Sequence, residues 1–337
     1  MDHKVFLLKR RRQYEQRTPE WYDARRSLIT ASSAASLLIR NEKTCKAYVT
    51  EYKEEETFDY NNKSCNPYTN KTQYLLDKCR QKAFKGNIAT FWGQKYEPVV
   101  TDLYSLHASK EVLEFGLLIH PEYPWLGASP DGITPDGVMI EIKCPFRRKI
   151  TGVPPLYYWI QVQLQLEVCD LDVCDFVEYE FTEFQTEEEY LDDETLDLKV
   201  LNKGVIIQVS KVQENPDIPA NIEDMKYIYP PKELIDQPEM LEWVTNILNY
   251  DKDEKELNYT PIYWKATENS ILRIHRNKEW FANVKDTLAK EWKQMVYYQT
   301  DNNYKKLLNQ VKTFTEGKVL VIDTNECMFS DEETEEN

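Results

Sequence analysis

Residues 127–132 read GASPDG, and residues 138–145 read VMIEIKCP. The second run is apolar enough to predict a strand, and successive side chains of a strand point to opposite faces. Glu141 and Lys143 therefore share one face, while Asp131 lies on a Pro-Asp-Gly turn just upstream. Two carboxylates and an ammonium that converge at one place predict a site for a divalent cation and an attacking water.

A Glu-x-Lys pair on its own is more typical of a surface salt bridge than of an active site. The residues around it favour a functional site. Glu97 follows an aromatic-rich stretch, and Gln161 and Gln163 lie on the next predicted segment. Together they form the polar group that a catalytic centre requires.

Composition bounds the class of protein. The chain has 337 residues, of which 41% are hydrophobic and 12% aromatic, so it can bury a substantial core. It has no apolar run long enough to span a bilayer and no cleavable signal pattern. Its seven cysteines show no Cys-x-x-Cys spacing, which argues against a zinc site and a disulfide framework. We expect a protein of a reducing intracellular compartment that is not secreted and does not act at membranes.

The formal net charge of -16 is unevenly distributed. Residues 1–160 carry 24 Lys and Arg against 19 Asp and Glu, whereas residues 161–337 carry 18 against 39. The basic half contains the predicted site. An acidic protein with a local basic groove can still hold phosphates, because charge acts where it is placed.

The predicted elements alternate in type, which indicates an α/β (α+β) fold with helices around a mixed central sheet. We expect a polar insertion at residues 41–72, strands at 112–119, 125–129, 138–143, 173–181 and 205–212, and helices from residue 19, from a cap at Thr30 or Ser32, and at 74–84, 88–106, 157–168, 233–248, 278–296 and 304–311.

Two arginines mark a candidate anion pocket. Arg25 and Arg26 lie close to the predicted start of the second helix, and helix N-termini favour anions. The alternative is a capped helix with solvated arginines, which composition alone does not exclude.

Six motifs together resemble, in order, those of the lambda exonuclease family, also called the YqaJ-like viral recombinase nucleases, of the PD-(D/E)xK superfamily. They are EWYDARR at 20–26, ITAS at 29–32, WGQKYE at 92–97, SPDG at 129–132, EIKCPF at 141–146 and QVQ at 161–163. The runs RRKI at 147–150 and VPPLYY at 153–158 resemble members encoded by large cytoplasmic DNA viruses. The resemblance covers residues 15–181.

This resemblance implies a Mg²⁺- or Mn²⁺-dependent 5′→3′ exodeoxyribonuclease that acts on the ends of double-stranded DNA in viral recombination, repair or replication. It implies that Asp131, Glu141, Glu97 and the Ile142 carbonyl would bind the metal. Lys143 would orient the attacking water and help to deprotonate it, and Gln161 would lie near that water or the scissile phosphate. Arg25 and Ser32 would bind the terminal 5′ phosphate. Further DNA contacts would come from Arg26, Arg147, Arg148, Lys149 and Gln163.

The same resemblance suggests a division of the chain. Residues 1–184 would form the nuclease core with its 5′-phosphate-binding helices, residues 185–330 an acidic extension that completes or covers it, and residues 331–337 a disordered acidic tail. Besides DNA, a single-strand annealing protein or host proteins would be partners, and the host cytoplasm would be the site of action. The oligomeric state stays open.

Two alternatives remain at this point. The first is a structure-specific endonuclease of the same superfamily, since a fold does not determine which form of DNA is cut. The second is a regulatory protein that retains the nuclease fold and binds a host partner.

Overall fold

A computed structural model describes residues 1–79, 86–194, 202–212, 225–234, 236–250, 257–301 and 303–308. Its helices and strands are, in chain order, α1 (His3–Arg10), α2 (Pro19–Arg26), β1 (Ile29–Thr30), the 3₁₀ helix η1 (Ala31–Leu37), α3 (Glu42–Tyr52), the 3₁₀ helix η2 (Glu55–Thr57), α4 (Lys71–Cys79), α5 (Ile88–Ala108), β2 (Leu118–Ile119), β3 (Leu126–Ala128), β4 (Gly132–Ile133), β5 (Val138–Lys143), α6 (Leu156–Cys169), β6 (Val173–Glu183), α7 (Glu187–Asp192), β7 (Lys203–Lys211), β8 (Lys226–Ile228), α8 (Gln237–Tyr250), β9 (Leu257–His275) and α9 (Lys278–Gln299).

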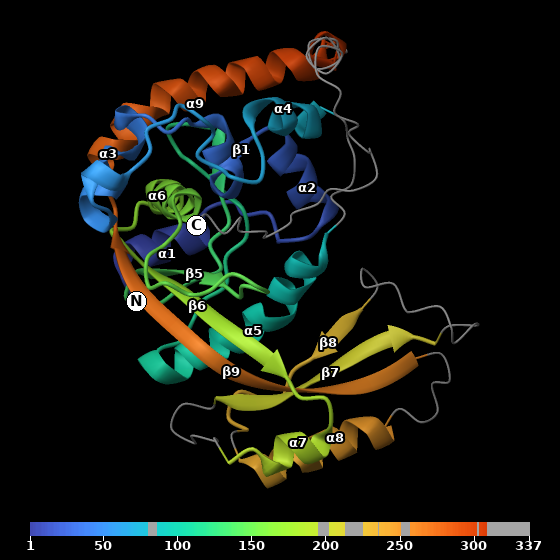
Figure 1. The fold of residues 1–337 in the computed structure, drawn as a ribbon. Coiled ribbons are helices and arrows are strands. Elements are labelled where there is room, and N and C mark those ends of the chain that lie inside the picture. Colours follow the sequence, from blue (N-terminus) through green and yellow to red (C-terminus); the bar gives the residue numbers. More distant parts are fainter. Residues whose placement is uncertain are drawn as a thin grey trace, which may run out of the picture.

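A six-stranded sheet with the order β4-β5-β6-β9-β7-β8 runs through the molecule (Figure 1). The strands β5 and β6 are parallel, and the other neighbouring pairs are antiparallel. A second, three-stranded sheet has the order β1-β3-β2. The predicted α/β fold with a mixed sheet flanked by helices is confirmed.

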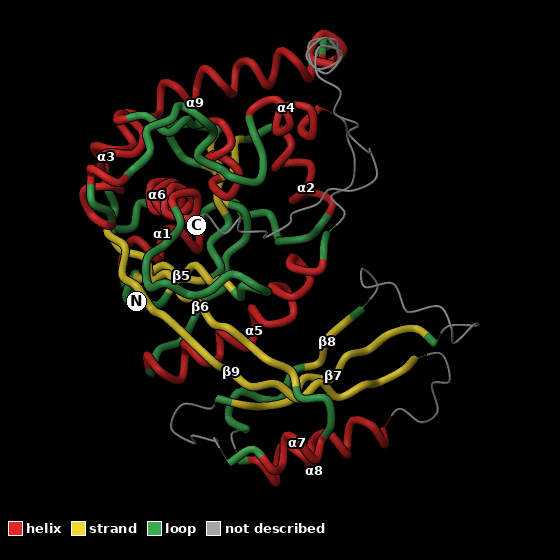
Figure 2. Tube along the Cα trace, viewed as in Figure 1, coloured by secondary structure: helices red, strands yellow, loops and turns green. Residues whose placement is uncertain are grey.

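The strand β9 joins the main body of the molecule to a smaller lobe, which consists of α7, β7, β8, α8 and the first half of β9. Its second half pairs with β6, from Trp264 to His275, and its first half pairs with β7, from Leu257 to Lys265. Figure 2 shows this strand continuing from one part into the other, with α7 and α8 on the outer side of the lobe. The lobe has its own apolar cluster, which includes Val205, Ile207 and Val244.

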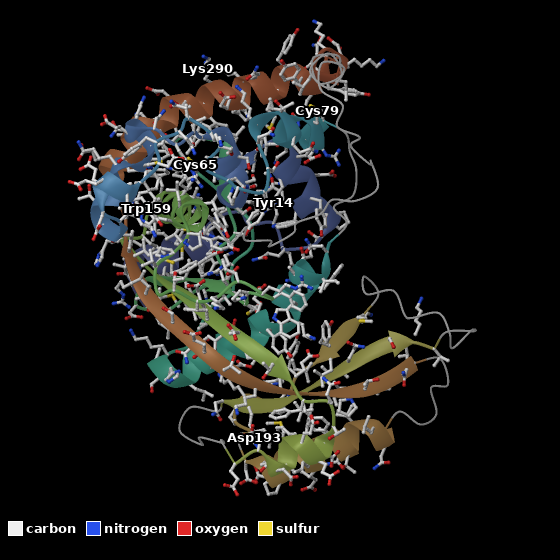
Figure 3. All side chains as sticks on the ribbon, in the orientation of Figure 1. Tyr14, Cys65, Cys79, Trp159, Asp193 and Lys290 are labelled. Carbon is white, nitrogen blue, oxygen red and sulfur yellow. The ribbon has the colours of Figure 1, made fainter. Side chains whose placement is uncertain are left out.

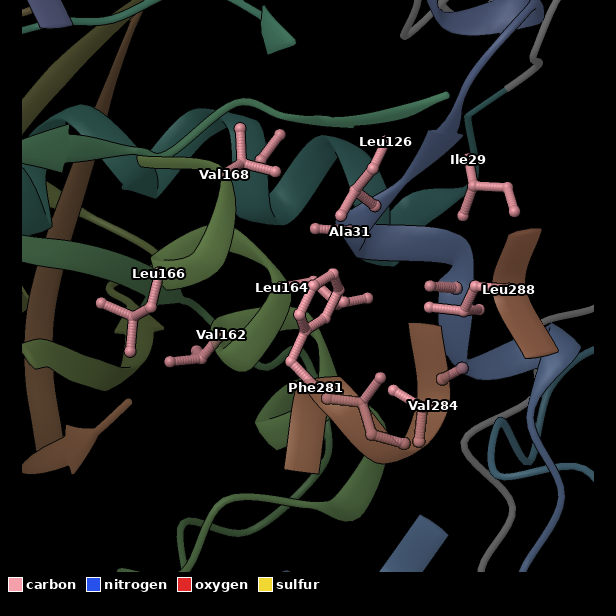
Figure 4. Packing of buried hydrophobic residues seen from close by; sticks show 14 of the residues in the cluster. Ile29, Ala31, Leu126, Val162, Leu164, Leu166, Val168, Phe281, Val284 and Leu288 are labelled. Carbon is pink, nitrogen blue, oxygen red and sulfur yellow. The ribbon is translucent and has the colours of Figure 1, made fainter. Parts of the chain in front are cut away.

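The helix α6 forms the centre of the main core. Eleven of its side chains are buried, on every side of the helix, which is typical of a helix enclosed by other elements. Its apolar residues share one cluster with Phe281, Val284 and Leu288 of α9 (Figure 4). Trp159, labelled in Figure 3, is fully buried and lies edge-to-face against Trp280, with ring centroids 5.2 Å apart.

Most of the predicted segments agree with the structure, and β5 has the predicted bounds. Three predictions differ. The helix after Thr30 is a 3₁₀ helix, the region 112–119 contributes strand only at Leu118–Ile119, and the 19-residue strand β9 was not expected. The predicted strand at 112–119 was wrong over most of its length. The predicted tail at 331–337 and the ends of two predicted helices, at 80–84 and 309–311, lie outside the described residues.

The later part of the chain builds on the first part. The helix α9 packs against α3, α4 and α6, and β9 covers the edge of β6 that would otherwise be open. Among the described helices, none is both long enough and apolar enough to cross a membrane.

Candidate active site

The site is built on the turn between β3 and β4 and on the strand β5. The backbone N–H of Ile142 donates to Asp131 Oδ2 at 2.7 Å, which fixes the turn against the strand. The N–H and C=O of one strand residue point toward the same edge, so the Ile142 carbonyl faces the side on which Asp131 lies. The predicted convergence of Asp131 with β5 is therefore present.

Glu141 is the most strongly held side chain of the site and is only 1% exposed. Its Oε1 accepts hydrogen bonds from Lys143 Nζ and from Gln161 Nε2, both at 2.5 Å. Its Oε2 accepts from Gln165 Nε2 at 2.7 Å. A buried carboxylate needs such partners, because an unpaired charge in the interior is costly.

Lys143 lies between the carboxylates and an aromatic ring. Its ammonium lies 4.6 Å from the centroid of Tyr158, where a cation is attracted to the ring face. Burial alone would lower the pKa of Lys143, but the charge of Glu141 and its neighbours Tyr158 and Asp131 raise it overall. The lysine is therefore held in its ammonium form.

The remaining acids crowd the same region. Burial raises the pKa of Asp131 well above its usual range, and the charges of Glu141 and Glu97 raise it further. Burial also raises the pKa of Glu97, although Arg17, at 3.6 Å, opposes that shift. The raised pKa values reflect first the burial of these two carboxyl groups and then, for Asp131, the neighbouring acids.

A cleft of about 410 Å³ opens over these residues. It is lined by Glu97 of α5, Asp131, and Lys143 of β5, and it extends to Ser32 of η1. The acidic group and the predicted anion-binding serine therefore face the same space.

The acids beside the cleft are candidate ligands for a metal ion. In the described ranges, no three Asp, Glu, His or Cys side chains gather closely enough to hold a metal ion. Glu141 is instead turned toward Lys143 and two amides, and Glu97 toward Arg17. The donor chemistry still fits a hard divalent cation, since carboxylate and carbonyl oxygens are its preferred ligands and a cation would offset the charge that raises the Asp131 pKa.

The predicted anion pocket contains Arg25 and Ser32 as a pair. Arg25 lies in the last turn of α2, and its guanidinium donates to Ser32 Oγ at 3.3 Å. The guanidinium carbon also lies 4.1 Å from the centroid of the Trp21 ring. Trp21 Nε1 donates to Ser129 Oγ at 3.2 Å, which ties this pocket to the turn that carries Asp131.

The other predicted DNA contacts have different environments. Arg26, Arg147 and Lys149 are exposed, and Arg26 lies 3.4 Å from Asp23. Arg148 also lines the cleft but is paired with the buried Glu178.

Gln163 is a predicted contact that the structure places away from the cleft, in the interior. It is 1% exposed, donates to the His275 carbonyl at 2.9 Å and accepts from the Asn277 N–H at 2.7 Å. The expected DNA contact at Gln163 is therefore corrected: this side chain fastens α6 to the start of α9.

Sequence reasoning missed Gln165 and Tyr158. Gln165 follows Gln161 by four residues on α6, and residues at that spacing share one face of a helix. Had the helix period been applied to Gln161, Gln163 and Gln165, it would have selected the first and third of these, which are the two that bind Glu141.

Comparisons with known proteins agree with the motifs. Residues 20–172 match the sequence profile of the YqaJ-like viral recombinase domain. A protein of Acanthamoeba polyphaga mimivirus is 30% identical over 342 residues, which cover 92% of this chain and 58% of that protein. A protein of African swine fever virus (strain Badajoz 1971 Vero-adapted) is 26% identical over 183 residues, or 44% of this chain and 45% of that protein. The chain thus spans about half the length of these viral relatives.

Solved structures with a similar course of the chain include an alkaline exonuclease from Laribacter hongkongensis in complex with dAMP. It has a TM-score of 0.45 and 18% identity, and the match covers 87% of this chain and all of that one. A phage-related exonuclease from Haemophilus somnus has a TM-score of 0.39 and 14% identity, with 81% and 96% covered.

The profile match begins and ends close to the limits of the motif set, from the Glu-Trp-Tyr run of α2 to the start of β6, and it includes every residue of the cleft named above. The part of the chain that carries the cleft, residues 20–172, is thus similar to the YqaJ-like viral recombinase domain.

Proposed function

We propose that this chain is a metal-dependent exodeoxyribonuclease that degrades duplex DNA from a 5′ end, in the recombination, repair or replication of viral DNA. One observation carries the proposal. A single cleft is lined by Asp131 and Lys143 and also by Ser32, which accepts a hydrogen bond from Arg25. Such a cleft can hold a terminal phosphate at one end and a phosphodiester beside the acids at the other.

We infer the roles of the side chains around Glu141 from their hydrogen bonds and ring contacts. The ammonium of Lys143 would donate a hydrogen bond to the attacking water, and its positive charge would favour loss of the proton from that water. Gln161 and Gln165 would keep the Glu141 carboxylate turned toward the site. Tyr158 would hold the ammonium in place from the opposite side.

A Mg²⁺ or Mn²⁺ ion would be held by Asp131, Glu141 and the Ile142 carbonyl, with Glu97 nearby. When bound, it would supply charge stabilisation at the phosphate oxygens and a lower pKa for a bound water. The chain's own part is to present hard oxygen ligands, while Lys143, Gln161 and Gln165 hold the Glu141 carboxylate in place.

Arg26, Arg147 and Lys149 are the exposed cations that we propose as contacts to the DNA backbone near the cleft. Such contacts would be independent of base sequence and would weaken as salt is added. This fits a nuclease that must act on ends of any sequence.

The direct test uses purified protein and linear duplexes labelled at one end, with and without Mg²⁺ or Mn²⁺. We expect nucleotides to be released from the strand that ends in a 5′ phosphate, only when the metal is present. A covalently closed circular duplex serves as the control substrate and should stay intact. Nicking of the circle would replace the exonuclease proposal with an endonuclease.

We expect Arg25→Ala to reduce the preference for 5′-phosphorylated over 5′-hydroxyl ends. A hydrogen bond to a charged group contributes about 1.5–3 kcal/mol, so the ratio of kcat/KM values should fall by roughly 10- to 100-fold. Arg26→Ala is the matched control, since Arg26 is exposed and follows directly in the sequence. Arg26→Ala should lower kcat/KM equally for 5′-phosphorylated and 5′-hydroxyl duplexes. A ratio that Arg25→Ala leaves unchanged would place the phosphate pocket elsewhere.

A further inference from the structure

The backbone at the end of α2 is held by side chains from distant elements. Lys78 Nζ of α4 donates to the Arg25 carbonyl at 2.5 Å and to the Leu28 carbonyl at 2.8 Å. Trp292 Nε1 of α9 donates to the Ser27 carbonyl at 2.9 Å. Gln299 Nε2, also of α9, donates to the Arg26 carbonyl at 3.0 Å and to the Lys78 carbonyl at 3.1 Å. Four consecutive carbonyls, at residues 25–28, thus accept from three side chains.

We call Lys78, Trp292 and Gln299 the α2 clamp. The last carbonyls of a helix have no partner within the helix and are usually satisfied by water or by the following turn. Here they are satisfied by donors of two other helices, so the last turn of α2 is fixed in position and direction. Arg25 belongs to that turn, and its guanidinium rests on Trp21 and Ser32. The backbone of Arg25 is therefore held by the clamp, and its guanidinium is held by Trp21 and Ser32.

The neighbouring cations Arg25 and Lys78 have no acidic partner among the described residues. Burial lowers the pKa of Arg25 to about 10, and burial together with the charge of Arg25 lowers the pKa of Lys78 to about 7. In the part of the chain that the structure describes, neither cation forms a salt bridge with an acid. Two neighbouring half-buried cations repel each other until an anion joins them. This pocket is thus suited to a strongly charged anion such as a terminal phosphate.

We propose that α9 is a positioning element of the 5′-phosphate pocket, in which Trp292 and Gln299 act with Lys78 to hold Arg25 against the end of the DNA. This inference rests on the proposed function, because it requires that the pocket binds a 5′ phosphate. Figure 1 shows α9 running beside α4 along the same side of the molecule as α2. The clamp residues of α9 lie more than a hundred residues beyond the end of the profile match at residue 172. The family domain is thus completed by a segment outside it.

The test is the double variant Trp292→Phe/Gln299→Leu, which removes the donors and keeps the approximate shapes of the side chains. Steady-state kinetics would be measured on two duplexes that differ only in a 5′ phosphate or a 5′ hydroxyl. We expect KM for the phosphorylated duplex to rise by about 10-fold, which corresponds to about 1.4 kcal/mol, because three hydrogen bonds that hold α2 and α4 in place are lost. We expect kcat, and KM for the hydroxyl duplex, to change little.

Trp280→Phe is the matched control. Trp280 lies at the other end of α9, and its Nε1 donates to the Thr44 carbonyl at 2.7 Å. The same substitution there also removes a bond to a backbone carbonyl, but far from α2. It should lower the melting temperature without changing the ratio of kcat/KM for the two ends. If the double variant folds poorly, Gln299→Leu alone should be measured. It should cause a smaller fall in the ratio of kcat/KM for the phosphorylated duplex to that for the hydroxyl duplex.

Lys78→Arg and Lys78→Met extend the test. The arginine keeps the charge and the donors and should preserve most of the preference, whereas the methionine should reduce it. A double variant that loses activity equally on both duplexes, or that keeps the wild-type ratio, would overturn the role of the clamp. A wild-type protein that cuts both duplexes equally well would refute the 5′-phosphate pocket itself, so the two failures are distinguishable.

Discussion

Replacing Lys143 with alanine is expected to lower the rate of DNA cleavage by about 10³-fold, the range that a single proton-transfer or charge-stabilising group supplies. The ammonium bonds to Glu141, and Lys143 also lines the cleft beside Asp131. Without it, the attacking water would lose both its proposed hydrogen-bond donor and the positive charge that favours its deprotonation. The measurement is single-turnover cleavage of a labelled duplex at saturating protein.

Lys149→Ala is the control for this prediction, because Lys149 is exposed and lies on the same segment. It should alter binding and its salt dependence only slightly. Circular dichroism and DNA binding in the presence of EDTA would show whether Lys143→Ala is folded and still binds. A folded Lys143→Ala protein that cleaves within a few-fold of the wild-type rate would remove the catalytic role assigned to this lysine.

Asp131→Asn is expected to cause the second large loss, about 10²–10⁴-fold in cleavage, through weaker binding of the divalent cation. The asparagine oxygen can still accept the Ile142 N–H, so the turn should keep its conformation. What is lost is one negative charge in a place where neighbouring charges already raise the pKa of the carboxyl group. The variant should therefore be at least as stable as the wild type when no metal is present.

Stabilisation by added Mn²⁺ supplies a readout that does not depend on activity. The melting temperature of the wild type should rise with Mn²⁺, and that of Asp131→Asn should rise much less. Asp136→Asn is the matched control, since Asp136 lies on the following turn and pairs with Lys110 at 2.5 Å. Equal stabilisation of Asp131→Asn and wild type by Mn²⁺ would show that Asp131 does not bind the ion.

The sequence was most informative where structure is set locally. The apolar run of β5 and its Glu-x-Lys pair were predictable because strand periodicity depends only on neighbouring residues. The helix α2 was predictable from Pro19 at its first position, and Thr18 does cap it through a hydrogen bond to the Trp21 N–H. The convergence of Asp131 with β5 followed from the same local reasoning.

The strand β9 was not predictable in this way. Its exposure alternates at both ends but not across its middle, and it contains Lys265, Glu268 and Arg273. It is a strand because it pairs on one side with β6 and on the other with β7, and such distant pairing leaves no local signal. The α2 clamp was not predictable from the sequence for the same reason, because Trp292 and Gln299 contact α2 only in the folded chain.

The central place of β9 has a consequence for the order in which this protein can be assembled. Until residues 264–275 have left the ribosome, the long apolar strand β6 has no neighbour along one edge. Exposed edges of this kind recruit other chains. The part of the chain that carries the cleft therefore cannot complete its sheet until the acidic segment before β9 has been synthesised. We expect fragments that stop after residue 184 to aggregate.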